Sequence, residues 1–99
     1  MRAVLTGKQR RYLRGLGHHL DPVVHVGKEG VSESLVGALD AALETHELIK
    51  VKLGESAGVD RHAIAGALAE AANAELAGVL GRTLLLYRRR KERPAIQLP

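Results

Sequence analysis

Four positive side chains lie within one short segment near the N-terminus, at Lys8, Arg10, Arg11 and Arg14. No acidic residue lies among them. On a helix these charges would repel one another, a cost that makes sense if a polyanion binds there. Each residue taken singly is also compatible with a helix face in contact with water. Together they predict contacts with the phosphate backbone of a nucleic acid.

The segment Gly27-Lys28-Glu29-Gly30 is the second candidate for phosphate binding. Its glycines let the backbone approach a ligand closely. The helix expected to follow would add unpaired N–H groups and the positive end of its dipole, and Lys28 would add a charge, whereas Glu29 opposes it. KH domains clamp nucleic-acid backbone with a comparable loop. An ordinary strand-to-helix turn needs the same glycines, so the loop favours phosphate binding only beside the basic helix.

Catalysis and metal binding have few candidates. There is no cysteine, which excludes disulfides, thiol nucleophiles and cysteine metal sites. The five histidines include no pair spaced i, i+4, and the Gly-x-x-Gly loop (residues 27–30) lacks the Gly-x-x-x-x-Gly-Lys-Ser/Thr pattern of a nucleotide-binding loop. Glu44 and Glu47 lie one turn apart, where we expect a helix end exposed to water. We predict a non-enzymatic protein with no cofactor, metal or small-molecule substrate.

Charge is segregated along the 99 residues, a length that fits a single domain over residues 1–99. Residues 1–28 hold six basic residues and one acid, residues 29–81 three basic and nine acidic residues, and residues 82–99 six basic residues and one acid. If the two basic ends meet in space, they form one patch suited to phosphate. Otherwise they are two unrelated solvated segments.

Targeting and membrane signals give a simple expectation. The basic N-terminus is not followed by the apolar stretch of a signal peptide. No apolar run approaches the ~20 residues of a membrane helix. We therefore expect a cytoplasmic protein without a membrane partner, with a monomer as the default.

The elements that must position the candidate residues begin with a basic helix. Thr6 and Gln9 form a capping-box pattern at its start, and Asp21-Pro22 ends it. Gly15 and Gly17 weaken its last turn. On a helical wheel one apolar side carries Gln9, Leu13, Leu16 and Leu20.

A strand over residues 23–26, a helix after Ser32 and a strand over residues 48–53 predict a βαβ unit with parallel strands. The helix would bury Leu35, Leu39, Ala42 and Leu43. The second strand alternates, with Ile49, Val51 and Leu53 on one face and Lys50 and Lys52 on the other. Lysines on an edge strand also guard against aggregation, and we favour that interpretation here.

The C-terminal half leaves one alternative open. Asp60 caps a helix whose buried side would carry Ile64, Ala67, Leu68 and Ala71, and its periodicity continues to Leu80. Against this, Gly81-Arg82 is typical of a two-residue hairpin turn before a strand over residues 83–87. That hairpin needs a partner strand near residues 75–80.

Five blocks of the sequence, in this order, resemble the CRM (chloroplast RNA splicing and ribosome maturation) domain family. They are Leu5-Thr6-Gly7-Lys8-Gln9-Arg10 with Leu13-Arg14, His18-His19-Leu20 with Pro22-Val23-Val24, the Gly-x-x-Gly loop, His46-Glu47-Leu48-Ile49-Lys50-Val51-Lys52, and Gly81 with Leu86-Tyr87-Arg88.

The resemblance implies a compact α/β domain with α-β-α-β-α-β-β order and a mixed four-stranded sheet. Its core would span about residues 5–88, with a basic tail over residues 89–99, and the third helix would end near Asn73. Single-domain bacterial members, of the YhbY type, associate with precursors of the large ribosomal subunit. The implied RNA-binding residues are Gly27, Lys28, Glu29, Gly30, Lys8, Arg10, Arg11, Arg14 and Arg88.

The predicted function is therefore non-catalytic RNA binding, to ribosomal RNA in maturing large-subunit particles. Tyr12 and Tyr87 are the two aromatic residues, and we expect both in the core. Recognition should then depend on backbone and shape rather than on stacked bases. The alternatives are a protein–protein module that docks an acidic ribosomal or assembly partner, and weak general DNA binding.

Overall fold

The computed structural model describes residues 4–27, 29–54 and 60–99. Its elements follow the order α1 (Gly7–Gly17), β1 (Pro22–Val26), α2 (Glu33–His46), β2 (Leu48–Leu53), α3 (Arg61–Ala71), β3 (Glu75–Leu80) and β4 (Thr83–Tyr87). The four strands form one sheet in the order β1-β2-β4-β3, with β1 parallel to β2 and the other pairs antiparallel. The predicted α/β class, element order and mixed sheet are confirmed.

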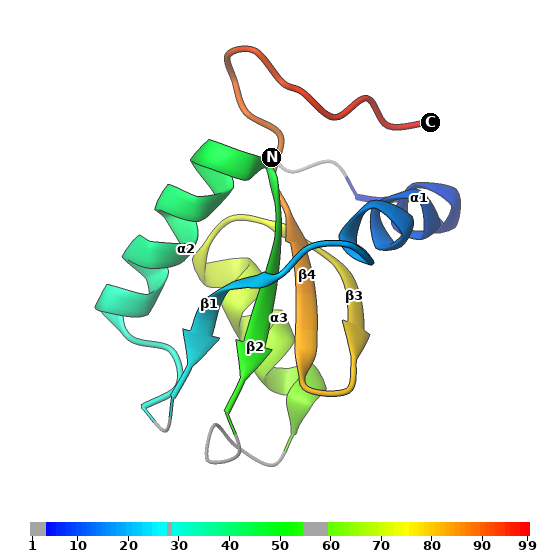
Figure 1. Cartoon of the computed structure of the whole chain (residues 1–99). Coiled ribbons are helices and arrows are strands. Elements are labelled where there is room, and N and C mark those ends of the chain that lie inside the picture. Colours follow the sequence, from blue (N-terminus) through cyan, green and yellow to red (C-terminus); the bar gives the residue numbers. More distant parts are fainter. Residues whose placement is uncertain (1–3, 28, 55–59) are drawn as a thin grey trace.

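The sheet separates two apolar clusters. In Figure 1, α3 lies behind the sheet and α2 lies to the left, beside β1. These two helices pack Leu39, Leu43 and Leu68 into the larger cluster. α1 packs on the opposite face, where Leu13 joins a smaller cluster with Ala77. Because α1 covers only part of this face, some of the sheet there stays open to solvent.

The predicted helix starts are confirmed by their caps. Thr6 and Gln9 form the reciprocal capping box of α1, the Ser32 hydroxyl accepts from the backbone N–H of Leu35, and Asp60 accepts from the first turn of α3. Each cap satisfies N–H groups that have no partner within the helix. Cap chemistry is local, which is why the sequence predicts these boundaries well.

The predicted inner side of α1 is partly wrong. Leu13 is fully buried, but Leu16 and Leu20 are 39% and 36% exposed. Gly17 is buried in their place, because without a Cβ it lets the helix approach Leu85 of β4. The glycine that weakens a free helix is therefore one of the contact points, with the buried Leu13, that bring α1 onto the sheet.

The open question about the third helix is settled in favour of the hairpin. α3 ends at Ala71, Asn73 takes a left-handed conformation with φ 53°, and β3 follows. Gly81 turns the chain with φ 58° between β3 and β4. The predicted buried side of α3 is partly wrong: Leu68 is buried, but Ala67 and Ala71 are exposed, and other alanines take their place, namely Ala65, Ala69 and Ala72.

Candidate nucleic-acid interface

The cations of α1 do not share one environment. Lys8, Arg11 and Arg14 are exposed and follow each other at three-residue spacing, which makes a continuous stripe along the helix. Arg10 is half-buried, and its guanidinium donates to the carbonyl oxygen of Leu5 at 3.1 Å. The stripe, rather than all four cations equally, is therefore available to a ligand.

Arg14 is held against the sheet by a glycine. A Cβ at Gly78 on β3 would lie 3.0 Å from Cδ and 3.1 Å from Cγ of Arg14. The aliphatic part of the arginine thus rests on the bare backbone of β3. Arg14 then lines a hollow of about 210 Å³ that also contains His18 and Lys50.

Lys50 and Lys52 belong to this face, which corrects the interpretation of them as edge-strand lysines. β2 is paired with β1 on one side and with β4 on the other, so it is an interior strand. Lysines there have no edge to protect. Their alternation with Ile49 and Val51 was visible in the sequence, but the position of the strand in the sheet was not.

The open part of the sheet connects α1 with the Gly-x-x-Gly loop. Across the strands His25 pairs with Lys52, and Lys52 pairs with Thr83. β1 then runs from this row into Gly27. We call the stripe of Lys8, Arg11 and Arg14, together with Lys50, Lys52 and Gly27 at the start of the loop, the basic face.

The described part of the loop has the geometry of a turn. The backbone N–H of Gly30 donates to the carbonyl of Gly27 at 3.1 Å, and Gly30 has φ 67°, a conformation that favours glycine. Glu29 is exposed and lines an open hollow of about 580 Å³ beside the start of α2. Lys28 lies outside the described residues.

Arg88 lies on the other side of the sheet, away from the basic face. Its guanidinium donates to the carboxylate of Asp40 at 2.7 Å, to the Ala72 carbonyl at 2.8 Å and to the Asp40 carbonyl at 3.2 Å. These contacts join α2 to the end of α3, so the guanidinium is occupied within the fold. Arg90 likewise donates to the carbonyl of Thr45 at the end of α2. Arg88 and Arg90 are therefore engaged within the fold, whereas Arg89 lines a hollow next to α1 together with Leu5 and Gln9.

Glu47 is fully buried, so the prediction that it lies at a solvated helix end is wrong. It follows α2 with φ 63°, and its carboxylate accepts from the backbone N–H groups of Arg90 at 3.0 Å, Ala95 at 2.6 Å and Ile96 at 2.9 Å. Desolvation opposes its charged form, but these hydrogen bonds and the Arg90 charge outweigh it and lower the pKa of Glu47. A buried carboxylate in this setting anchors the C-terminal tail.

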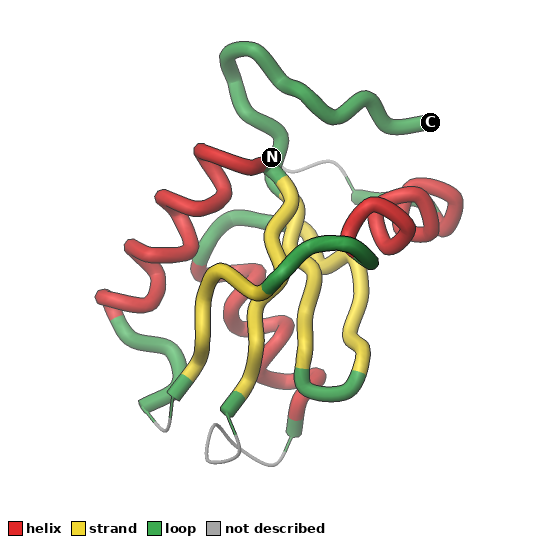
Figure 2. Tube along the Cα trace, viewed as in Figure 1, coloured by secondary structure: helices red, strands yellow, loops and turns green. Residues whose placement is uncertain are grey.

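The anchored tail returns to α1. Figure 2 shows residues 88–99 as a loop that leaves β4 and ends beside α1. Ile96 and Leu98 pack on the cluster that contains Leu5 and Tyr87, and the Gln9 side chain donates to the carbonyl of Pro99 at 3.2 Å. Tyr87 is buried as predicted, and burial raises the pKa of its hydroxyl. Tyr12 is 42% exposed instead, so its predicted core position is wrong.

Other chemistry has little support in the structure. Among residues 4–27, 29–54 and 60–99, no cluster of three histidine or carboxylate side chains could hold a metal ion. No helix in the described part of the chain is long and apolar enough to cross a membrane.

Comparison with known proteins agrees with this architecture. "Probable RNA-binding protein YqeI" of Bacillus subtilis is 41% identical over 96 residues, which cover 97% of this chain and all of the relative. An "RNA-binding protein" of Haemophilus influenzae is 42% identical over 98 residues, an alignment that covers 96% of this chain and 95% of the relative. The solution structure of SAV1595 from Staphylococcus aureus superposes with a TM-score of 0.84 at 43% identity, over 97% of this chain and 100% of that one. The CRS1 / YhbY (CRM) domain profile matches residues 5–88, and the chain therefore belongs to this family.

Proposed function

We propose that this protein binds RNA without catalysis and holds its phosphates on the basic face. The observation that carries the proposal is the continuity of positive charge from Arg14 on α1 to Lys50 and Lys52 on the open sheet, beside the Gly-x-x-Gly loop. The names of the relatives from Bacillus subtilis and Haemophilus influenzae support RNA as the ligand. Lysine and arginine contacts to phosphate release counterions, so binding should depend strongly on salt.

We propose further that the RNA is ribosomal and lies in maturing large-subunit particles in the cytoplasm. The support is the resemblance to single-domain bacterial members of the family. The protein would act as a monomer, since its net charge of +4 opposes self-association through the basic face.

Sedimentation of a cell extract tests this proposal. The extract is run on a sucrose gradient with and without RNase, and the protein is detected in each fraction. We expect co-migration with large-subunit precursors and a shift to the top after RNase. The double variant Lys50→Gln/Lys52→Gln should move toward the top without RNase, while Lys91→Gln, an exposed charge on the tail, should behave as the wild type.

The other outcomes identify the alternatives. Association that survives RNase would indicate an acidic protein partner instead of RNA. Wild-type protein at the top of both gradients would contradict the ribosomal role. Purified protein that binds duplex DNA as tightly as RNA at matched salt would indicate general nucleic-acid binding.

A further inference from the structure

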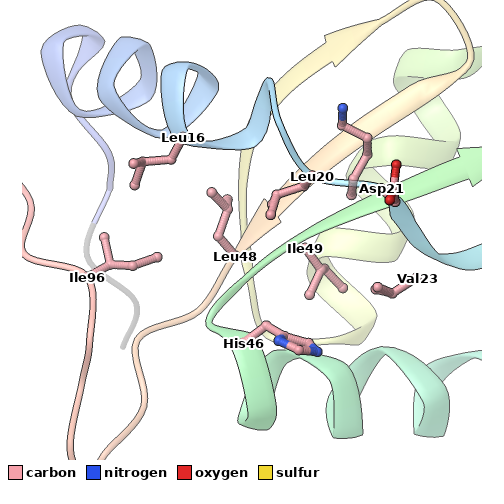
Figure 3. Close-up of a pocket in the computed structure, with 9 residues that line it drawn as sticks. Leu16, Leu20, Asp21, Val23, His46, Leu48, Ile49 and Ile96 are labelled. Atoms are coloured by element: carbon pink, nitrogen blue, oxygen red, sulfur yellow. The ribbon is translucent and has the colours of Figure 1, made fainter.

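An apolar groove of about 420 Å³ opens beside the end of α1. Figure 3 shows Leu16, Leu48 and Ile96 converging on it, with Leu20 and Val23 along the next wall. Leu16, Leu20 and Val23 are 39%, 36% and 51% exposed. Adjacent apolar side chains exposed in one concave site are typical of a binding surface.

Charge around the groove selects its occupant. Lys50 lines the groove and also lines the neighbouring hollow that contains Arg14 and His18. An apolar group that enters the groove therefore brings its attached chain next to cations. A nucleotide matches this arrangement, since its base has apolar faces and its phosphate is an anion. A second copy docked through the same basic face does not match, because that contact would bring like charges together.

We infer that the groove takes the base of an unpaired nucleotide whose phosphate lies at Lys50. This inference rests on the proposed function and deepens it. A base inside a duplex cannot enter a side pocket, so the groove gives preference for single-stranded RNA, loops or bulges. Asp21 and His46 at the rim offer polar groups to the base edge. Recognition then includes a base and does not depend on backbone and shape alone.

The buried carboxylate helps to build this groove. Glu47 holds the backbone of Ile96, whose side chain forms one wall. The wall therefore comes from the tail, far from α1 and β1 in sequence. Glu47 is a positioning residue for the groove, while Leu20, Val23 and Ile96 contact the base.

The test compares two strands with the same phosphates. One is a short single-stranded oligoribonucleotide, and the other is an abasic ribose-phosphate strand of equal length. Affinities are measured by fluorescence anisotropy at one salt concentration. Wild-type protein should bind the strand with bases about five- to tenfold more tightly, the low end of the effect of one stacked base, because the walls are aliphatic.

Variants assign this preference to the groove. Leu20→Asn and Val23→Asn should each remove most of it while binding the abasic strand as the wild type does. Val4→Asn is the matched control, because Val4 is 81% exposed and does not line the groove. In wild-type protein, the methyl NMR signals of Leu20, Val23 and Ile96 should shift on adding the strand with bases, and that of Val4 should not. The NMR measurement does not depend on the folding of any variant.

The outcomes separate this inference from the proposed function. Equal, salt-dependent binding of both strands would overturn the groove and leave phosphate binding intact. No binding of either strand would overturn both. A preference that survives the groove variants but disappears in Tyr12→Leu would assign the base to that exposed ring and overturn the inference.

Discussion

Gly17 on α1 lies so close to Leu85 on β4 that a methyl group at Gly17 would be 2.5 Å from Cδ2 and 2.7 Å from Cδ1 of Leu85. The basic stripe of α1 is therefore positioned by a residue that has no side chain. We expect Gly17→Ala to lower the free energy of unfolding by about 1–3 kcal/mol, because Leu85 must move. Urea unfolding measures this loss.

Gly15→Ala is the matched control in the same helix. A Cβ at Gly15 meets nothing within 4 Å. Alanine there should raise the free energy of unfolding by up to about 1 kcal/mol through its higher helix propensity. Equal effects of the two substitutions would contradict the close contact between α1 and β4.

Lys50 and Lys52 should contribute to RNA affinity although they lie in a strand. We expect each glutamine substitution to weaken binding across many RNA sequences and to lower the slope of log K against log salt by about 1 per lost phosphate contact. Filter binding over a range of salt concentrations measures both quantities. If Lys52→Gln matches the tail control Lys91→Gln in affinity and slope, the basic face does not extend over the sheet.

Arg88 should matter for stability rather than for RNA. Arg88→Gln removes hydrogen bonds to the carbonyls of Ala72 and Asp40, which we expect to cost about 1–2 kcal/mol. The ion pair with Asp40 adds little, because that carboxylate is 61% exposed. Thermal unfolding should show the loss, and RNA affinity at low temperature should be unchanged. If Arg88→Gln unfolds at the same temperature as the wild type but binds RNA more weakly, Arg88 belongs to the RNA interface.

Glu47 should make stability depend on pH in the acidic range. Its pKa is lower in the folded chain than its ordinary value of 4.5, so its contribution is fully present above that pH. The contribution is lost as the pH falls through the lower pKa of the folded state. Glu47→Gln should therefore destabilise the protein at pH 7, by about 1–3 kcal/mol. It should also reduce the fall in the free energy of unfolding at acidic pH, which we call the acid limb of the pH profile.

Glu44→Gln is the control for that measurement. Glu44 has a 61% exposed side chain and a single 3.9 Å approach to Arg88. Its substitution should change the free energy of unfolding by less than about 0.5 kcal/mol and leave the acid limb in place. Parallel pH profiles of wild type and Glu47→Gln would show that the buried carboxylate does not anchor the tail.

Local patterns predicted the elements better than their packing. The caps at Thr6, Ser32 and Asp60 were predicted because each is a hydrogen bond between neighbours in sequence. The inner sides of α1 and α3 were predicted only in part. On α1, Gly17 faces the sheet where leucines were expected, and on α3 three alanines are buried in place of the two that were expected. Backbone approach, and not hydrophobicity alone, decides which side packs.

The candidate site shows the same division. Lys8, Arg11 and Arg14 follow from the absence of acids around them, and residues 27–30 follow from their glycines. Lys50 and Lys52 were set aside because strand order cannot be read from one strand. Tyr12 was expected in the core, yet it lies on the exposed side of α1.

The sequence by itself determined the helix caps, the parallel βαβ unit and the positive charge of α1, since each depends on residues close together along the chain. The hairpin turn at Gly81 competed with a longer helix, and the family resemblance favoured the hairpin. Tertiary structure alone decided that β2 is an interior strand, that Arg88 binds Asp40, and that Glu47 holds the tail beside the apolar groove. These contacts join residues 27 or more positions apart, and a periodic pattern carries no information about such partners. The accessible charges therefore depend on long-range contacts, which occupy Arg88 and leave Lys50 and Lys52 on the open face of the sheet.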